Sequence, residues 1–216
     1  MNVLTVCWAA KGGSGATVVA CALALTSASQ SEPSWLLDLA GDAPAALGIA
    51  EPNGPGVLDW VASASAPPTA MDALGAAAAP GLRVVPRGSA TPAGDHPRWH
   101  DLGTFLAERA PHTVVDAGTG RPPPALFAAA QRRLLVIRPC YLALRRAAAS
   151  TLIPTGIIVI HEPGRALRAE DVAAAVRAPV VAEIELDPAV ARSVDAGLLA
   201  ARIPRQLASA VRGIVG

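Results

Sequence analysis

Short apolar runs separated by turn residues recur along the whole chain. Each run is continuous rather than alternating between apolar and polar residues, which is typical of strands buried on both faces of a parallel sheet. The pattern predicts strands at Val3–Trp8, Trp35–Leu39, Leu82–Pro86, Thr113–Val115, Leu134–Ile137, Ile157–Ile160 and Val180–Ile184.

Helical patterns lie between most of these runs. They cover Ala16–Ser29, Gly56–Ser63, Ala70–Ala78, Arg98–Arg109, Pro124–Arg132, Leu142–Leu152, Ala169–Arg177 and Ala189–Ala200. Alternation of strand and helix predicts an α/β fold, with a doubly wound, mostly parallel sheet and helices on both faces. A chain of 216 residues is the size of one domain, so we expect residues 1–216 to form a single unit.

One lysine stands out in the composition. Lysine and arginine together number 18, yet Lys11 is the only lysine, so arginine carries nearly all of the positive charge. Lysine differs from arginine in offering a compact ammonium on a flexible stem. The net charge of +1 gives no support for nucleic acid as a partner.

Lys11 opens the glycine-rich stretch Lys11-Gly12-Gly13-Ser14-Gly15-Ala16-Thr17, which runs from the first predicted strand into the first predicted helix. A glycine-rich turn in this position aims backbone N–H groups and the positive end of the helix dipole at an anion. The sequence therefore predicts a phosphate-binding loop made of Lys11, Gly12, Gly13, Ser14, Gly15, Ala16, Thr17 and Val18.

Two aspartates follow predicted strands. Asp116 ends the apolar run Thr113–Val115, the pattern of the carboxylate that orients magnesium in phosphate-loop proteins. Asp38 lies in Trp35–Leu39, and Asp42 follows it. We expect Asp42, just before Pro44, to cap a helix, with a role near the phosphate site as the alternative if the loop folds back.

These segments resemble the ParA/MinD family of ATPases, whose deviant Walker A loop reads K-G-G-x-G-K-[ST]. The likeness covers nearly the whole chain, including Gly56–Trp60, Leu82–Gly88, Arg138–Pro139, Leu144–Ala147 and Ala182–Asp187. It implies ATP and Mg²⁺ as cofactors, with Thr17 and Asp116 as the metal ligands. It also implies catalytic roles for Lys11, acting on the nucleotide of a partner subunit, and for Asp38, which helps to organise the metal site.

Among the departures from the family pattern, three bear on catalysis or base recognition. Ala16 stands where the family has the lysine that holds the phosphates of its own subunit, and Ala40 stands where it has a second aspartate that positions water. Loss of such groups predicts weak or absent hydrolysis. His161 replaces an asparagine that contacts adenine in the family.

The resemblance implies a nucleotide-controlled homodimer, with a protein partner that the sequence does not identify, acting in partition, division-site or pilus-assembly positioning. The alternative is a pseudo-ATPase scaffold that keeps the fold without turnover. A metabolic phosphate-loop enzyme is disfavoured because no motif for a second substrate is present.

The remaining sequence features bear on the cellular compartment of the protein and on contact with a membrane. The cysteines Cys7, Cys21 and Cys140 show no C-x-x-C spacing and are expected to be free thiols in a reducing compartment. No signal-peptide pattern is seen, so we expect a cytoplasmic location. The apolar face of the C-terminal helix at Arg205–Val215 is expected to pack on the domain rather than to contact a membrane.

Overall fold

The computed structural model describes residues 2–30, 33–109 and 112–215. Within these residues the strands are β1 Val3–Ala9, β2 Ser34–Asp38, β3 Ala76–Ala79, β4 Leu82–Val85, β5 His112–Thr119, β6 Arg132–Ile137, β7 Gly156–His161 and β8 Val180–Glu185. The helices are α1 Ala16–Ser29, α2 Ala43–Leu47, α3 Val57–Ala62, α4 Met71–Leu74, α5 Arg98–Arg109, α6 Pro124–Ala129, α7 Tyr141–Ala148, α8 Ala169–Val176, α9 Pro188–Asp195 and α10 Arg205–Val215, with a 3₁₀ turn η1 at Pro68–Ala70.

The described strands form one sheet in the order β3-β4-β2-β5-β1-β6-β7-β8. Every neighbouring pair is parallel except β3 and β4, which pair antiparallel at one edge. The chain leaves β1 for β2 on one side and later crosses from β5 to β6 on the other. Such a reversal in strand order opens a crevice at the carboxyl ends of the strands, where ligands bind in doubly wound folds.

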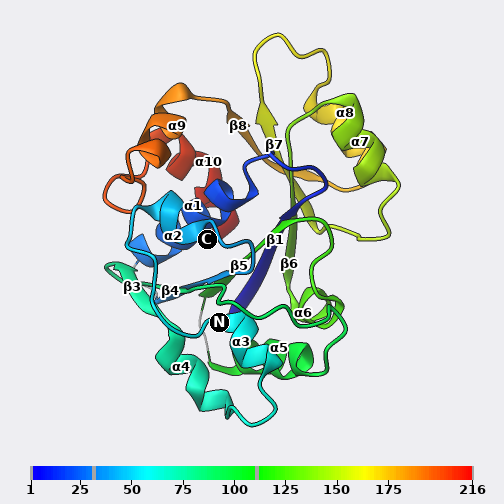
Figure 1. The fold of residues 1–216 in the computed structure, drawn as a ribbon. Coiled ribbons are helices and arrows are strands. Elements are labelled where there is room, and N and C mark those ends of the chain that lie inside the picture. The colour runs from blue at the N-terminus through cyan, green and yellow to red at the C-terminus, as the bar shows by residue number, and fades with distance from the viewer. Residues whose placement is uncertain (1, 31–32, 110–111, 216) are drawn as a thin grey trace.

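Helices cover both faces of the sheet, as Figure 1 shows. Helices α1, α2, α9 and α10 pack on one face, and α3 to α8 pack on the other, each over its own apolar core. The predicted doubly wound, mostly parallel α/β architecture is therefore confirmed. Three predicted helices, α1, α5 and α10, have the bounds that the sequence pattern indicated.

The prediction of a helix at Ala70–Ala78 is wrong in its second half. Helix α4 ends at Leu74, and Ala76–Ala79 forms the antiparallel edge strand β3. Alanine favours helices over strands, but Gly75 ends the helix and Gly81, at φ +74°, turns the chain back onto β4. Tertiary pairing with β4 therefore decides the conformation. The short helix α2 begins after Asp42, where the sequence predicted the start of a helix, but its extent was not predicted.

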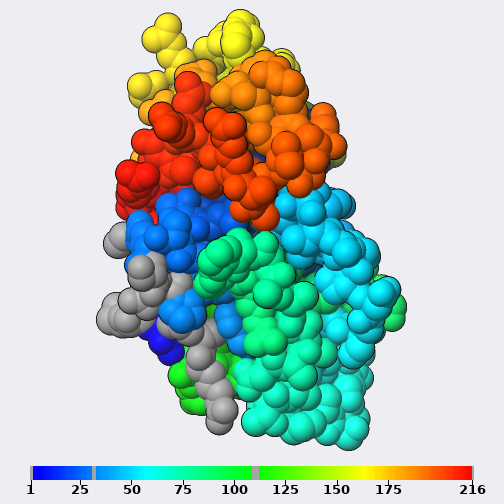
Figure 2. All heavy atoms as spheres, turned by 90° about the vertical axis from the view of Figure 1, so that its left-hand side faces the viewer, coloured from blue at the N-terminus to red at the C-terminus, as the bar shows by residue number. Residues whose placement is uncertain are grey.

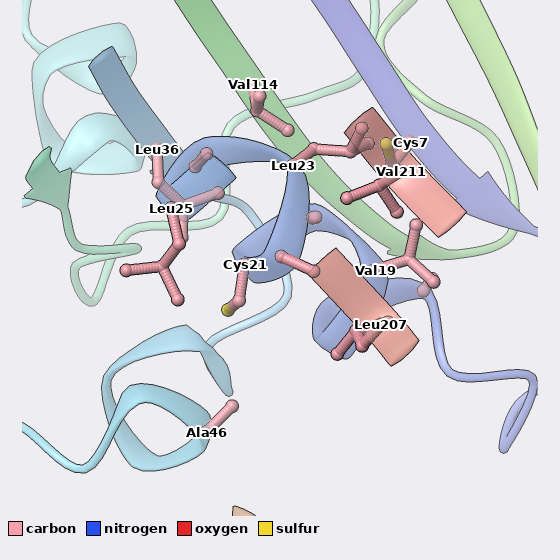
Figure 3. Close-up of a cluster of buried hydrophobic side chains, with 14 of the residues drawn as sticks. Cys7, Val19, Cys21, Leu23, Leu25, Leu36, Ala46, Val114, Leu207 and Val211 are labelled. Atoms are coloured by element: carbon pink, nitrogen blue, oxygen red, sulfur yellow. The ribbon is translucent and has the colours of Figure 1, made fainter. Parts of the chain in front are cut away.

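The C-terminal helix α10 packs across α1, as expected. Leu207, Val211, Ile214 and Val215 are buried, and Figure 3 shows Leu207 and Val211 beside Val19 of α1. In Figure 2, α10 (red) lies directly against the blue surface of α1. Across the described part of the chain, no helix has the length and apolar character needed to span a bilayer.

Replacing Leu207 by alanine tests this packing. Leu207→Ala should lower the free energy of unfolding by roughly 2–4 kcal/mol, because it removes a buried side chain and leaves a cavity. Urea denaturation measures the change. The control Gln206→Ala, on the exposed face of the same helix, should shift stability by less than about 0.5 kcal/mol. Equal effects from the two variants would contradict the packing.

Candidate functional site

The glycine-rich loop connects the end of β1 to the start of α1. Gly13 and Gly15 have φ of +75° and +86°, and a Cβ at either position would meet no other atom. Glycine is therefore favoured there by backbone conformation rather than by space. The buried Ser14 hydroxyl donates to the carbonyl of Lys11 at 2.7 Å and ties the loop together.

Helix α1 presents an uncompensated N-terminus to this loop. Its N-cap residue, Gly15, has no side chain to accept from the first-turn amides, and the first turn holds no acidic residue. The first N–H groups of a helix have no partner within the helix, so the amides at Ala16, Thr17 and Val18 and the helix dipole face the space in front of the loop. This arrangement suits an anion.

A cavity of about 500 Å³ lies in front of the loop, and we call it the loop cavity. The loop and the start of α1 form one part of its lining, and the turns after β2 and β4, together with the last residues of β5, form another. Its lining comprises Ala9, Gly13, Ser14, Gly15, Ala16, Thr17, Val18, Leu39, Ala40, Asp42, Arg87, Ala117, Gly118 and Thr119. Of the residues predicted for the phosphate loop, Gly13 to Val18 line this cavity, whereas Lys11 and Gly12 do not.

Lys11 lies outside the loop cavity. Its ammonium donates to the carbonyl of Gly12 at 3.3 Å, and the residue lines a separate cavity of about 190 Å³ together with Arg138 and Arg165. Gly12 also lines this second cavity and not the first. The side chain of Lys11 is therefore directed away from the cradle formed by its own loop.

Asp116 is buried below Thr17 in β5, a strand that extends to Thr119 rather than ending at Val115. Its Oδ1 accepts from the amide of Gly118 at 3.0 Å, whereas its Oδ2 has no hydrogen-bond partner among the described residues. Burial raises the pKa of Asp116, while the nearby Thr17 hydroxyl and the Gly118 amide act to lower it.

Asp38 is in register with Asp116 across β2 and β5 and is also buried. Its Oδ1 accepts from the amides of Ala40 at 2.9 Å and Gly41 at 2.6 Å, and its Oδ2 accepts from the amide of Ala43 at 3.0 Å. Burial raises the pKa of Asp38 to about 6, opposed by these hydrogen bonds. Asp38 does not line the loop cavity; it shapes the turn that does.

Asp42 corrects one expectation. It occupies the N-cap position of α2, but its carboxylate makes no capping hydrogen bond, and Asp38 accepts from the first helical amide instead. Asp42 is exposed and lines the loop cavity, where its charge raises the pKa of Asp116. Ala40, also in the lining, places a methyl group where the family pattern has a carboxylate.

Among the described residues, no group of three or more His, Cys, Asp and Glu side chains could hold a metal ion. Magnesium at phosphate sites needs no such group, because one or two protein oxygens, phosphate oxygens and water complete its octahedron. The unpartnered Oδ2 of Asp116 and the Thr17 hydroxyl are oxygen donors of this kind. These residues fit Mg²⁺ bound together with a phosphate ligand.

A second, mainly apolar cavity of about 280 Å³ adjoins the loop at Gly15 and Val18. Ile160 and Ile184 form part of its lining at the ends of β7 and β8. His161 is not in this lining; its Nε2 pairs with the carboxylate of Glu183 at 2.6 Å. Sequence reasoning missed this cavity, and it also missed Arg87 in the loop cavity, since neither carries a motif.

Solved structures with this fold are ATPases and their relatives. A ParA-family ATPase from Chlorobium tepidum aligns over 100% of this chain and 99% of its own, with TM-score 0.77 and 18% identity. The septum site-determining protein MinD from Pyrococcus horikoshii, complexed with Mg-ADP, aligns over 100% and 95%, with TM-score 0.79 and 15% identity. A Cyanothece McdA variant in complex with ATP aligns over 99% and 96%, with TM-score 0.69 and 18% identity.

No protein-family model and no curated protein sequence matches the chain. The chain has the ParA/MinD fold, that of a phosphate-loop nucleotide-binding domain, as the sequence motifs predicted.

The raised pKa of Asp38 predicts that the free energy of unfolding depends on pH. An aspartate with a pKa of about 6 in the folded state and about 4 in the unfolded state takes up a proton on folding between these values. Its contribution to stability is therefore present at low pH and lost as pH rises through 6. The unfolding free energy of the wild type, relative to Asp38→Asn, should increase on the order of 1–2 kcal/mol between about pH 7 and pH 5.

Urea denaturation at the two pH values measures this difference. The exposed Asp95→Asn serves as the control and should show no such trend. A difference between wild type and Asp38→Asn that is independent of pH would contradict the assignment of a raised pKa to Asp38.

Proposed function

We propose that this chain binds a magnesium–nucleoside triphosphate, ATP by analogy with its structural neighbours, and uses it to control assembly of a homodimer. Its role would be spatial, in positioning a division, partition or pilus-assembly apparatus in the cytoplasm, through a protein partner not yet identified. One observation carries the proposal. The loop cavity joins free backbone amides and the Thr17 hydroxyl, and the buried, unpartnered Oδ2 of Asp116 lies in β5, whose last residues line the same cavity.

In this proposal, different groups of residues bind the phosphates, the metal ion and the base. Amides of Gly13 to Val18 cradle phosphate oxygens, and Thr17 and Asp116 hold the ion, which neutralises phosphate charge when bound. Asp38 holds the turn after β2, which contributes Ala40 and Asp42 to the lining of the cavity. The adjoining apolar cavity at Gly15 and Val18 is the place in which a nucleobase would be buried.

Hydrolysis is slow or absent in this proposal. Ala16 and Ala40 line the loop cavity and bring neither a cation from the loop nor a carboxylate for water. Removing one preorganised charge from a phosphoryl-transfer site often costs about a hundredfold or more in rate. Asp42 is a carboxylate on the same wall, but it is exposed and makes no hydrogen bond among the described residues that would fix its direction.

The side chain of Lys11 is directed away from its own loop cavity, and this supports a role for Lys11 at a dimer interface. An ammonium outside its own loop cavity cannot serve the phosphates held there, whereas a facing second subunit would bring other phosphates to it. Arg138 and Arg165 share its cavity, and Glu162 pairs with both of them at 2.7 Å. Lys11 is therefore the cation left for a partner's nucleotide.

A second candidate is a pseudo-ATPase scaffold that keeps the fold and the dimer surface without binding nucleotide. The two alanines in the loop cavity are the observation that favours it. Nucleotide binding separates the two candidates, because only the first requires an occupied loop cavity.

Calorimetric titration with ATP, with and without magnesium, tests the proposed function. The wild type should bind Mg-ATP with micromolar to submillimolar affinity, with phosphate release on the same samples well below about one per second. Thr17→Ala should remove most of the benefit of magnesium, because it deletes a ligand oxygen. The exposed Thr104→Ala is the control and should bind as wild type does. No binding by the wild type at millimolar Mg-ATP would favour the scaffold.

Dimerisation tests the role of Lys11. Light scattering should show a wild-type dimer only with ATP and magnesium, and Lys11→Ala should weaken that dimer by about tenfold or more through loss of a charge-assisted contact. Lys11→Arg should not fully restore it, because a planar fork replaces a compact ammonium. The exposed Arg205→Ala controls for lost charge. Equal dimerisation by wild type and Lys11→Ala would refute the assignment.

A further inference from the structure

Arg87 gives the loop cavity a positive side chain. Among the described residues that line this cavity it is the only lysine or arginine. Asp42 shares the lining, and the buried Asp116 lies in β5, whose last residues also line the cavity, so Arg87 is one cation near two carboxylates. A bound divalent ion would reverse that balance and leave Arg87 free to face phosphate oxygens.

The backbone of Arg87 is fixed by helix α3. The amide of Leu58 donates to the Arg87 carbonyl at 2.9 Å, and the amide of Val57 donates to the Pro86 carbonyl at 2.8 Å. The next residues are held by Asp59, which accepts from the amides of Ser89 and Ala90 at 3.1 Å and 2.9 Å. The turn after β4 thus presents Arg87 from a rigid support.

The side chain of Arg87 is held at its stem, with its end left open. Its Nε donates to the carbonyl of Leu39 at 3.1 Å, and its Cδ packs against Gly41, where a Cβ would approach it to 3.2 Å. Its Nη atoms have no hydrogen bond or carboxylate partner among the described residues. A half-buried guanidinium held by its stem, with free terminal donors in a polar cavity, is suited to bind an oxyanion.

Arg87 and Ala16 line the same cavity. Phosphate loops of the usual pattern place a lysine at the residue before the threonine, where it reaches the β- and γ-phosphates. Here that residue is Ala16, in the first turn of α1. Ala40 and Gly118, also in the lining, bring no bulky side chain to the cavity.

We propose that Arg87, delivered by the turn after β4, supplies the phosphate-binding cation that Ala16 cannot, and contacts the terminal phosphate of the bound nucleoside triphosphate. This inference rests on the proposed function and adds Arg87 to the residues proposed to bind the nucleotide. Arg87 follows β4, on one side of β1 in the sheet, whereas the apolar cavity assigned to the base is lined by residues of β7 and β8 on the other side. It therefore reads the phosphate farthest from the base, and its loss should affect a triphosphate more than a diphosphate.

Arg87→Met is the variant that isolates the charge. Methionine keeps an aliphatic stem against Gly41 while it removes the guanidinium. By calorimetry, Arg87→Met should weaken binding of Mg-ATP by about tenfold or more and binding of Mg-ADP by less than about threefold. Arg83→Ala is the matched control. Arg83 lies in β4, the strand before the turn that carries Arg87, and donates to the carbonyl of Gly75 at 3.0 and 3.2 Å, outside the loop cavity, so both affinities should stay unchanged.

A rescue separates phosphate contact from mere bracing of the Leu39–Asp42 turn. Ala16→Lys combined with Arg87→Met should recover Mg-ATP affinity to within about threefold of wild type, because it returns a cation from the loop side. A bracing role would not respond to a lysine on α1. Thermal unfolding of each variant verifies that it is folded, and Arg87→Gln replaces Arg87→Met if the latter fails to fold.

The outcomes are distinct. If the wild type binds nucleotide and Arg87→Met binds Mg-ATP equally well, the role of Arg87 is overturned while the proposed function stands. Equal weakening of Mg-ATP and Mg-ADP without rescue by Ala16→Lys also overturns it, in favour of bracing. If the wild type binds neither nucleotide, this inference fails together with the proposed function.

Discussion

The buried carboxylate of Asp38 is the interaction on which the geometry of the site depends. A charge taken out of water needs compensating donors, and Asp38 obtains them from three backbone amides of the turn that follows it. Those three bonds fold residues 39–43 tightly over the end of β2. The turn then presents Ala40 and Asp42 to the loop cavity and offers the Leu39 carbonyl that holds Arg87. One aspartate therefore sets the shape of a whole wall.

The register of the sheet adds a second consequence. Pairing of Asp38 with Asp116 across β2 and β5 puts two acidic groups side by side in the interior. Burial raises the pKa of both carboxyl groups, and the charge of Asp116 raises the pKa of Asp38 further. Asp38 is compensated by amides, whereas Asp116 retains an oxygen without a partner. In the proposed function, that imbalance makes Asp116 the carboxylate that would hold the ion, while Asp38 holds the turn.

The loop shows how a phosphate site tolerates the loss of one charge. Backbone amides and the helix dipole come from conformation, so Gly13, Gly15 and the uncapped α1 preserve them whatever side chain occupies position 16. A side-chain cation has no such fixed origin, and any segment that borders the cavity can deliver it. In the proposed arrangement, Arg87 supplies it from a turn that α3 and Asp59 hold in place, far from the loop in sequence.

The sequence by itself determined the α/β fold and the outline of the site. Continuous apolar runs marked the buried strands, and the glycine spacing marked a loop between β1 and α1 with Thr17 at its end. These features are local, so they can be read from neighbouring residues. Tertiary structure decided that Ala76–Ala79 pairs as an edge strand, that Asp38 rather than Asp42 caps α2, and that Lys11 and Arg87 enter different cavities. Each of these outcomes depends on which distant segments meet at the carboxyl edge of the sheet, and strand order, which no local pattern encodes, fixes that meeting.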